Sequence, residues 1–190
     1  MHETSHLHVD AILRADPLRW WLLELVSHLD LPDCWIAAGF IRNAVWDALH
    51  GRSPQPPLSD VDVIWFDPDR IEESHDRKIE KVLRAAAPSI DWSVKNQARM
   101  HSRNSDSPYR SATDAMRYWP ETATAVAARR RGKDQLDVAS PLGLDDLFNL
   151  VLRPTPRFAC EKLPIYQKRV ESKAWITVWP LLECAEPFGS

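Results

Sequence analysis

The chain has 190 residues, of which 44% are hydrophobic and 27% are charged, and its formal net charge is -3. This length predicts one domain with a substantial core, and the charge excludes a global basic bias toward nucleic acid, although a local basic patch stays open. Three cysteines without a CxxC pair, no N-terminal signal-peptide pattern and no apolar run of about 20 residues predict a cytoplasmic protein without disulfides or a membrane span.

The N-terminal part of the sequence predicts a helix, a strand and a second helix. Residues 10–29 have apolar side chains at helical spacing, and Asp16 followed by proline is typical of a helix start. The run "CWIAA" at 34–38 predicts a short buried strand. Residues 40–51 have the apolar period of an amphipathic helix that ends at a glycine.

Beyond a proline-rich loop, alternating Asp and Val predict a strand at 60–66. Residues 69–86 predict a charged surface helix, and 89–96 predict a third strand. A further strand is expected at 135–140 and a short helix at 143–152.

Two segments stay open at this level. Residues 98–118 are polar without a clear period, and 122–129 fit either a helix or a strand. The tail beyond 156 predicts a loop with one or two helices. The pattern favours an α+β fold, a mixed sheet with helices on one side. We expect a single domain over 1–190, whose core is about 20–152 and whose small C-terminal helical extension is about 153–190.

The stretch with the most chemistry contains Asp60 and Asp62 within an apolar strand. Residues two apart on a strand face the same side, so Val61 and Val63 point to the core and the two acids point away from it. Adjacent carboxylates repel each other unless a cation lies between them, and Mg²⁺ or Mn²⁺ takes such oxygen ligands. The same pattern also fits an exposed strand edge or a turn, and that alternative stays open.

Gly39 lies where the preceding strand ends and the next helix begins. A residue without a side chain lets a phosphate approach the backbone, and a helix N-terminus favours an anion. Arg42 in the first turn is suited to bind phosphate oxygens, and Asn43 to hold a sugar hydroxyl or the loop. This glycine and the two aspartates are therefore predicted to flank one crevice.

The stretch "GFIRNAVWDALHGRSPQPPLSDVDVIWFD" (39–67) resembles the head of the DNA polymerase beta-like nucleotidyltransferases, in which Gly-Gly/Ser, a helix and Asp-x-Asp follow one another. Its helix is similar to the head domain of tRNA CCA-adding enzymes and poly(A) polymerases. The segments "WSVKNQARMHSRNSDSPY", "WPETATAVAARR" and "PLGLDDLFNLVLRPTPRF" resemble uncharacterised bacterial nucleotidyltransferase-like proteins over about 20–180. The chain departs from the enzyme pattern at Phe40, in place of a second small residue, and at Asn43, in place of an acid.

The resemblance implies metal-dependent transfer of a nucleoside monophosphate from a nucleoside triphosphate to a hydroxyl acceptor, with release of pyrophosphate. Asp60 and Asp62 would hold Mg²⁺ or Mn²⁺, and a neighbouring strand would add a third carboxylate, for which Asp91 is the first candidate and Asp137 the second. The residues expected at the nucleotide are Gly39, Phe40, Arg42, Asn43, Ser59 and Lys95.

The acceptor and the oligomeric state cannot be read from the sequence. Because 190 residues leave no room for the helical body with which CCA-adding enzymes bind tRNA, a small molecule such as an aminoglycoside-type sugar, or a protein, is favoured over an RNA end. Tyr109 and Trp119 are candidates for stacking a base, with core packing as the alternative. The alternative function is an inactive nucleotide-binding sensor or interaction protein on the same fold, without a third acid beside Asp60 and Asp62.

Overall fold

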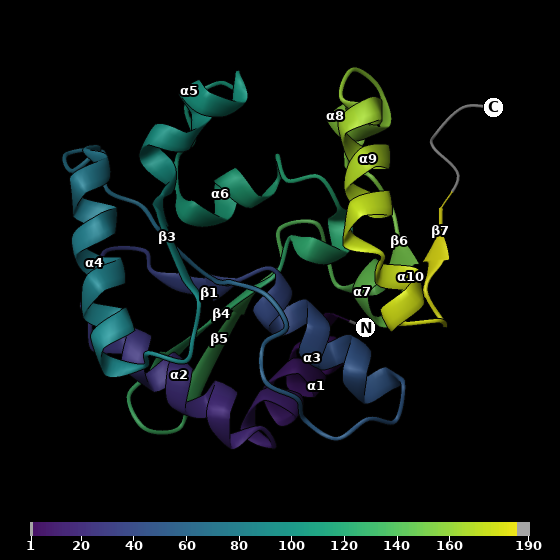
Figure 1. Ribbon diagram of the computed structural model, residues 1–190, viewed down its shortest axis with the longest axis horizontal. Helices are drawn as coiled ribbons and strands as arrows, with labels where there is room; N and C mark the ends of the chain where they lie inside the picture. The colour runs from purple at the N-terminus through teal and green to yellow at the C-terminus, as the bar shows by residue number, and fades with distance from the viewer. Residues whose placement is uncertain (1, 186–190) are drawn as a thin grey trace.

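A mixed five-stranded sheet is the centre of the fold in the computed structural model, which describes residues 2–185 (Figure 1). Its strand order is β3-β2-β1-β4-β5. The strands are β1 (Trp35–Ala37), β2 (Val61–Trp65), β3 (Trp92–Asn96), β4 (Ala127–Arg131) and β5 (Gln135–Ala139). β2 and β3 are parallel, and the other neighbours are antiparallel. The α+β class with a mixed sheet is confirmed.

Helices and short turns of helix connect these strands. They are α1 (His2–Arg14), α2 (Pro17–Ser27), α3 (Gly39–Leu49), α4 (Glu73–Ala86), η1 (Gln97–Arg99), α5 (Met100–Asn104), α6 (Ala112–Met116), η2 (Thr122–Thr124), α7 (Asp145–Phe148), α8 (Pro156–Ala159), α9 (Leu163–Lys173) and α10 (Trp175–Val178). Two short strands, β6 (Val151–Leu152) and β7 (Glu183–Cys184), pair in parallel near the C-terminus.

The predicted strands are confirmed within a few residues of their expected ends, but the helix predicted at 10–29 is two helices. Asp16 separates them, because its carboxylate accepts a hydrogen bond from the backbone N–H of Arg19 at 3.0 Å and so caps α2. The ambiguous segment 122–129 contains both a 3-10 turn and the start of β4. The open segment 98–118 forms the short helices α5 and α6.

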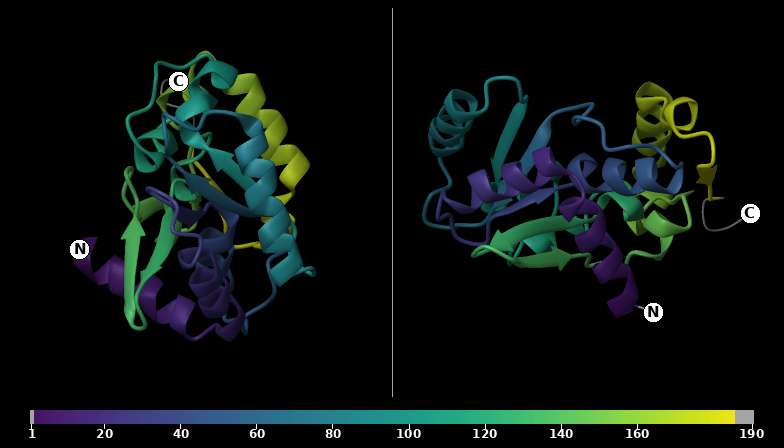
Figure 2. Two further views of the ribbon diagram at one scale, coloured as in Figure 1. Left: turned by 90° about the vertical axis from the view of Figure 1, so that its left-hand side faces the viewer. Right: turned by 90° about the horizontal axis from the view of Figure 1, so that it is seen from below.

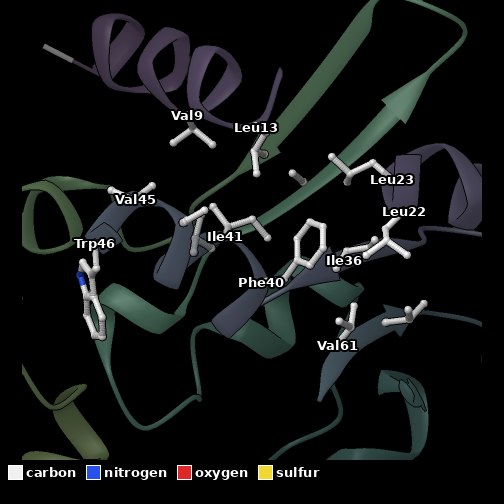
Figure 3. Close-up of a cluster of buried hydrophobic side chains, with 14 of the residues drawn as sticks. Val9, Leu13, Leu22, Leu23, Ile36, Phe40, Ile41, Val45, Trp46 and Val61 are labelled. Carbon is white, nitrogen blue, oxygen red and sulfur yellow. The ribbon is translucent and has the colours of Figure 1, made fainter. Parts of the chain in front are cut away.

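The main core lies on one face of the sheet (Figure 3). Val61 and Val63 point into it, as predicted, and α1 to α4 cover this face. The expectation that helices cover only one side is wrong, because Met116 of α6 packs on the other face against Trp35 and Ile64. These apolar side chains on the second face have to be buried as well.

The turn between β1 and α3 is strained at Ala38, whose φ is 56° and ψ is -123°. This backbone conformation is almost exclusive to glycine, and it costs a residue with a Cβ about 1–3 kcal/mol. This turn places the start of α3 at the end of β1, and it is held there in part by the Ala38 N–H, which donates to the Val126 carbonyl at 2.9 Å.

We expect Ala38→Gly to raise the free energy of unfolding by about 1 kcal/mol, since relief of strain exceeds the entropy that glycine adds to the unfolded chain. Urea denaturation of both proteins measures this difference. Ala37→Gly, in regular strand next to it, is the control and should destabilise the fold. A less stable Ala38→Gly variant would contradict the strain.

The C-terminal helices pack against α3, on the side of the molecule away from α4 (Figures 1 and 2). The ring centroids of Trp175 and Trp179 lie 6.0 and 5.1 Å from that of Trp46, and Trp179 Nε1 donates to Asp47 at 2.8 Å. The extension therefore shares the main core cluster. Residues 186–190 of the expected extension lie outside the described residues. Within 2–185, no helix is long and apolar enough to cross a membrane.

Candidate active site

Asp60 and Asp62 lie together on the wall of one cavity of about 480 Å³. Asp62 is in β2, with Ala37 of β1 and Ser93 of β3 as its neighbours across the sheet. Asp60 comes one residue before the strand begins and is exposed. The structure thus brings both predicted aspartates to the same crevice as Gly39.

The environment of Asp62 disfavours its charge. Burial, and next the negative charge of Asp60, raise the pKa of Asp62 to about 6, while a hydrogen bond from Ser93 and the charges of Arg169 and Arg42 act in the opposite direction. In the described part of the chain, no Lys, Arg or His nitrogen lies within 4.0 Å of either carboxylate. The carboxylate pair therefore has no direct ion-pair partner among the described residues, and Arg169 and Arg42 offset its charge only from farther away.

A divalent cation fits this pair. Mg²⁺ is commonly held by one or two carboxylates, with waters and substrate phosphates as the other ligands. Within residues 2–185 there is no group of three His, Cys, Asp or Glu side chains that could hold a metal without such help. The donor set suits a cation that binds together with a phosphate.

Gly39 is the first residue of α3 and lines the same cavity. The Ile41 N–H donates to the Ala38 carbonyl at 3.2 Å, but the first N–H groups of a helix have no intrahelical partner, and no side chain caps α3. A Cβ added to Gly39 would lie 3.4 Å from Ser59 Oγ, 3.5 Å from Arg42 Nη2 and 3.6 Å from Asn43 Nδ2. Those polar atoms surround a space that suits an anion at the helix N-terminus.

Arg42 is a buried cation without a carboxylate partner, and only 4% of its surface is exposed. Its Nη1 donates to Thr124 Oγ1 at 2.7 Å, and its Nε and Nη2 donate to Asn43 Oδ1 at 3.2 and 2.9 Å. A guanidinium has five N–H donors, so these contacts leave two for a ligand. Burial lowers the pKa of Arg42 to about 10, so the group stays charged at neutral pH.

Tryptophan rings surround the Arg42 guanidinium. Its Cζ lies 4.8 Å from the Trp46 ring centroid and 4.5 Å from that of Trp175, and the Cζ of Arg169 lies 5.3 Å from the same Trp175 centroid. Rings fix the position of a guanidinium and favour its charge without neutralising it. The geometry therefore holds a positive charge ready for an anion.

The C-terminal extension supplies residues that sequence reasoning missed. Arg169 and Lys173 of α9 line the cavity, one helical turn apart. Glu121 is fully buried, and its Oε1 accepts from Arg169 Nε at 2.7 Å. The i, i+4 spacing of the two cations was readable in the sequence, but nothing in it placed α9 beside Gly39.

The structure does not bring Asp91 into the site. Its side chain is 77% exposed, it precedes β3, and it approaches Arg84 at 4.0 Å. The residue opposite Asp62 on β3 is Ser93, because the register pairs Val61 with Trp92. Asp137, the second candidate, pairs with Arg129 at the far edge of the sheet, at 3.0 Å. A third carboxylate from either residue is therefore not part of the observed arrangement.

Two further predictions need correction or refinement. Phe40 is 1% exposed and its side chain packs among core residues such as Ile36, away from the cavity in which nucleotide contact was predicted (Figure 3). The two small residues at the start of α3 are its N-cap, Ala38, and its first residue, Gly39, and Phe40 is the core residue that follows. Asn43 Oδ1 accepts from Arg42 and so orients it, while Asn43 Nδ2 borders the space in front of Gly39.

The remaining predicted residues lie on either side of Asp62. Ser59 lines the cavity that contains Gly39. Lys95 lies instead in a second cavity on the other side of Asp62, where its Nζ is 3.3 Å from Glu80 Oε1. Tyr109 is buried and donates to Asp106, as core packing predicts, whereas Trp119 lines the second cavity.

A mixed sheet that presents two acids opposite a helix N-terminus and a buried arginine gives an α+β domain whose cavity is suited to a phosphate and a divalent cation. Residues 24–184 match the family model described as Nucleotidyltransferase. The chain belongs to this nucleotidyltransferase family. A search of curated proteins found no match.

Solved structures give the same fold. An NMR structure described as revealing a CCA-adding enzyme head domain is 35% identical, with a TM-score of 0.83 and 94% of each chain covered. A tRNA-processing enzyme complex is 15% identical, with a TM-score of 0.52, and covers 86% of this chain and 43% of its own. An apo tRNA-processing enzyme is 14% identical, with a TM-score of 0.50, and covers 98% and 45%. This chain spans less than half of those two chains, which support the fold alone.

We expect Gly39→Ala to lower nucleoside triphosphate affinity by about tenfold, because the added methyl group fills the space in front of the helix N-terminus. Stability should hold, since the nearest atoms would be at ordinary contact distance and alanine favours helix. Calorimetric ATP titration and thermal unfolding measure the two effects. Ala48→Gly, at the other end of α3, is the control that changes stability without changing affinity. Unchanged ATP affinity in Gly39→Ala would exclude phosphate from this space.

Proposed function

We propose that this protein transfers a nucleoside monophosphate from a nucleoside triphosphate to an acceptor hydroxyl and releases pyrophosphate. The observation that carries the proposal is Arg42, a buried guanidinium without a carboxylate partner in the described chain, whose cavity also contains Asp60 and Asp62. Glu121 and Asp62 favour the charged form of Arg42 only from a distance, so a buried guanidinium faces the cavity without a direct anionic partner, and a phosphate is an anion that fits there.

The residues divide the work as follows. Arg42, with Gly39 at the start of α3, binds the β- and γ-phosphates and holds the leaving pyrophosphate. Arg169 and Lys173 add positive charge from α9, and Glu121 keeps Arg169 in place.

Asp60 and Asp62 would hold Mg²⁺ or Mn²⁺, which supplies charge neutralisation for the transferring phosphate when bound. Ser93 donates to Asp62 and so favours the charged form that a cation needs. Positioning and electrostatic stabilisation account for most of the rate in reactions of this class. The core and its C-terminal extension act as one unit in this proposal, because each contributes to the cavity.

A second candidate function is nucleotide binding without transfer. It is favoured by one observation, the position of Asp91 outside the site with no third acid in its place among the described residues. Two carboxylates are enough to hold one cation with a triphosphate. The two functions therefore differ in turnover and not in binding.

Incubation of the purified protein with each labelled nucleoside triphosphate and Mg²⁺ or Mn²⁺ tests the proposal. We expect metal-dependent pyrophosphate release that is lost in the Asp60→Ala/Asp62→Ala double variant. Label on the protein itself would identify a protein acceptor. Metal-dependent binding without release, in the presence of varied acceptors, would support the second function, and absence of any nucleotide binding would refute both.

A further inference from the structure

A second cavity, of about 470 Å³, meets the cavity that contains Gly39 and Arg42 at Asp62. Both cavities are lined by Ala38, Asp62 and Arg169. The first lies toward the start of α3, and the second extends over the sheet face toward α5 and Trp119. Asp62 therefore stands at the junction of two spaces, each large enough for a small ligand.

From this arrangement we infer that the second cavity binds the acceptor and that the acceptor carries a phosphate group. The inference rests on the proposed function. Phosphoryl transfer needs the attacking and leaving oxygens roughly in line across the phosphorus. With the triphosphate on the side of Gly39 and Arg42, the attacking hydroxyl arrives from the opposite side of Asp62, which is where the second cavity lies.

The reaction balances with the groups present. The acceptor oxygen forms a bond to the α-phosphorus, and the bond from that phosphorus to the bridging oxygen breaks. Pyrophosphate leaves with the electron pair, and the hydroxyl proton passes to solvent. No oxidant or further reactant is needed.

The charge lining the second cavity selects the class of acceptor. Lys95, Arg103 and Arg169 line it, and Asp62 is its one acidic lining residue in the described chain. Glu80 and Glu121, which pair with Lys95 and Arg169, are not part of the wall.

Arg103 in this wall has no carboxylate within 4.0 Å in the described chain and is exposed. Trp119 and Met100 add apolar surface that suits a ring or carbon skeleton. An acceptor with a negative group and a hydroxyl matches this combination.

A third cavity would suit an acceptor of the opposite charge. It has a volume of about 430 Å³ and is lined by Asp60 and Asp91, with no Lys or Arg in its wall. A cationic acceptor such as an aminoglycoside would be attracted there and repelled from Arg103. The charge of the acceptor therefore reports which of the two cavities it uses.

The test measures binding of defined probes to the full chain saturated with Mg²⁺ and a non-hydrolysable ATP analogue. The phosphate-bearing probes are ribose 5-phosphate and a short oligoribonucleotide, which separate a small acceptor from an RNA end. Ribose and kanamycin are the neutral and cationic comparisons. We expect at least one phosphate-bearing probe to bind more tightly than both comparisons.

Charge reversal then locates the site. Arg103→Glu and Lys95→Glu should each weaken the phosphate-bearing probe about tenfold or more while ATP affinity stays unchanged. Arg77→Glu, an equally large charge change on the exposed face of α4, should leave both unchanged. The inference would be overturned if kanamycin or ribose bound more tightly than the phosphate-bearing probes, or if the Arg103 and Lys95 variants bound those probes as well as the wild type. In either case, retained ATP binding would leave the proposed function standing. A wild-type protein that does not bind ATP would refute the proposed function itself.

Discussion

Asp62→Asn is expected to raise the free energy of unfolding near neutral pH by up to about 3 kcal/mol and to abolish Mg²⁺-dependent nucleotide binding. The first effect follows from the pKa of Asp62, which burial raises from 3.8 to about 6. An amide of the same shape carries no charge to desolvate. The second effect follows because the amide is a much poorer ligand for a hard cation.

The sign of the pH dependence follows from the same pKa. Between about pH 4 and pH 6 the native state binds a proton at Asp62 that the unfolded chain has lost, so this residue lowers stability as the pH rises through that window. The advantage of Asp62→Asn should therefore be small near pH 4, grow up to about pH 6 and stay constant above it.

Urea denaturation across this pH range, with and without Mg²⁺ and ATP, measures both effects. Asp60→Asn is the matched control, because Asp60 is exposed: it should lose ligand binding as well but gain far less stability. An Asp62→Asn variant that is less stable than the wild type near neutral pH would show that the carboxylate has a structural role. Retained Mg²⁺-dependent ATP binding would exclude Asp62 from the metal site.

Arg42→Met is expected to weaken ATP binding by at least about 100-fold, because it removes the buried charge that faces the cavity. Its cost in stability should stay within about 1–2 kcal/mol, since the lost hydrogen bonds are offset by removal of an unpaired buried charge. Arg42→Lys keeps the charge but loses the fork and the three hydrogen bonds, and should lie between the two proteins in affinity.

Arg19 provides the matched control for this experiment. It is 1% exposed and forms an ion pair with Asp16, so Arg19→Met leaves a buried acid without its partner. We expect that variant to lose about 3–5 kcal/mol of stability and to keep its ATP affinity per folded molecule. ATP titration and denaturation of both variants separate the two roles. Equal ATP affinity in Arg42→Met and the wild type would remove the phosphate site from α3.

The sequence by itself determined the parts of this protein that depend on local chemistry. Alternation placed Val61 and Val63 in the core and Asp62 on the opposite face, because side chains on a strand alternate. The strand end, the glycine and the basic first turn predicted that Gly39 and Arg42 lie together at a helix N-terminus, because that arrangement needs only neighbouring residues, and both line the cavity of Asp62.

Only the tertiary structure decided which distant residues join them. The parallel register of β2 and β3 puts Ser93 opposite Asp62 and leaves Asp91 exposed, just before β3 begins. The sequence does not reveal this register, and a shift of two residues decides which of the two side chains faces Asp62. Arg169 reaches the site because the tryptophans of the extension pack on α3. Such contacts bury apolar side chains that are far apart in the chain, and no periodic pattern in the sequence predicts which of them meet. They place the C-terminal cations and the second cavity beside Asp62.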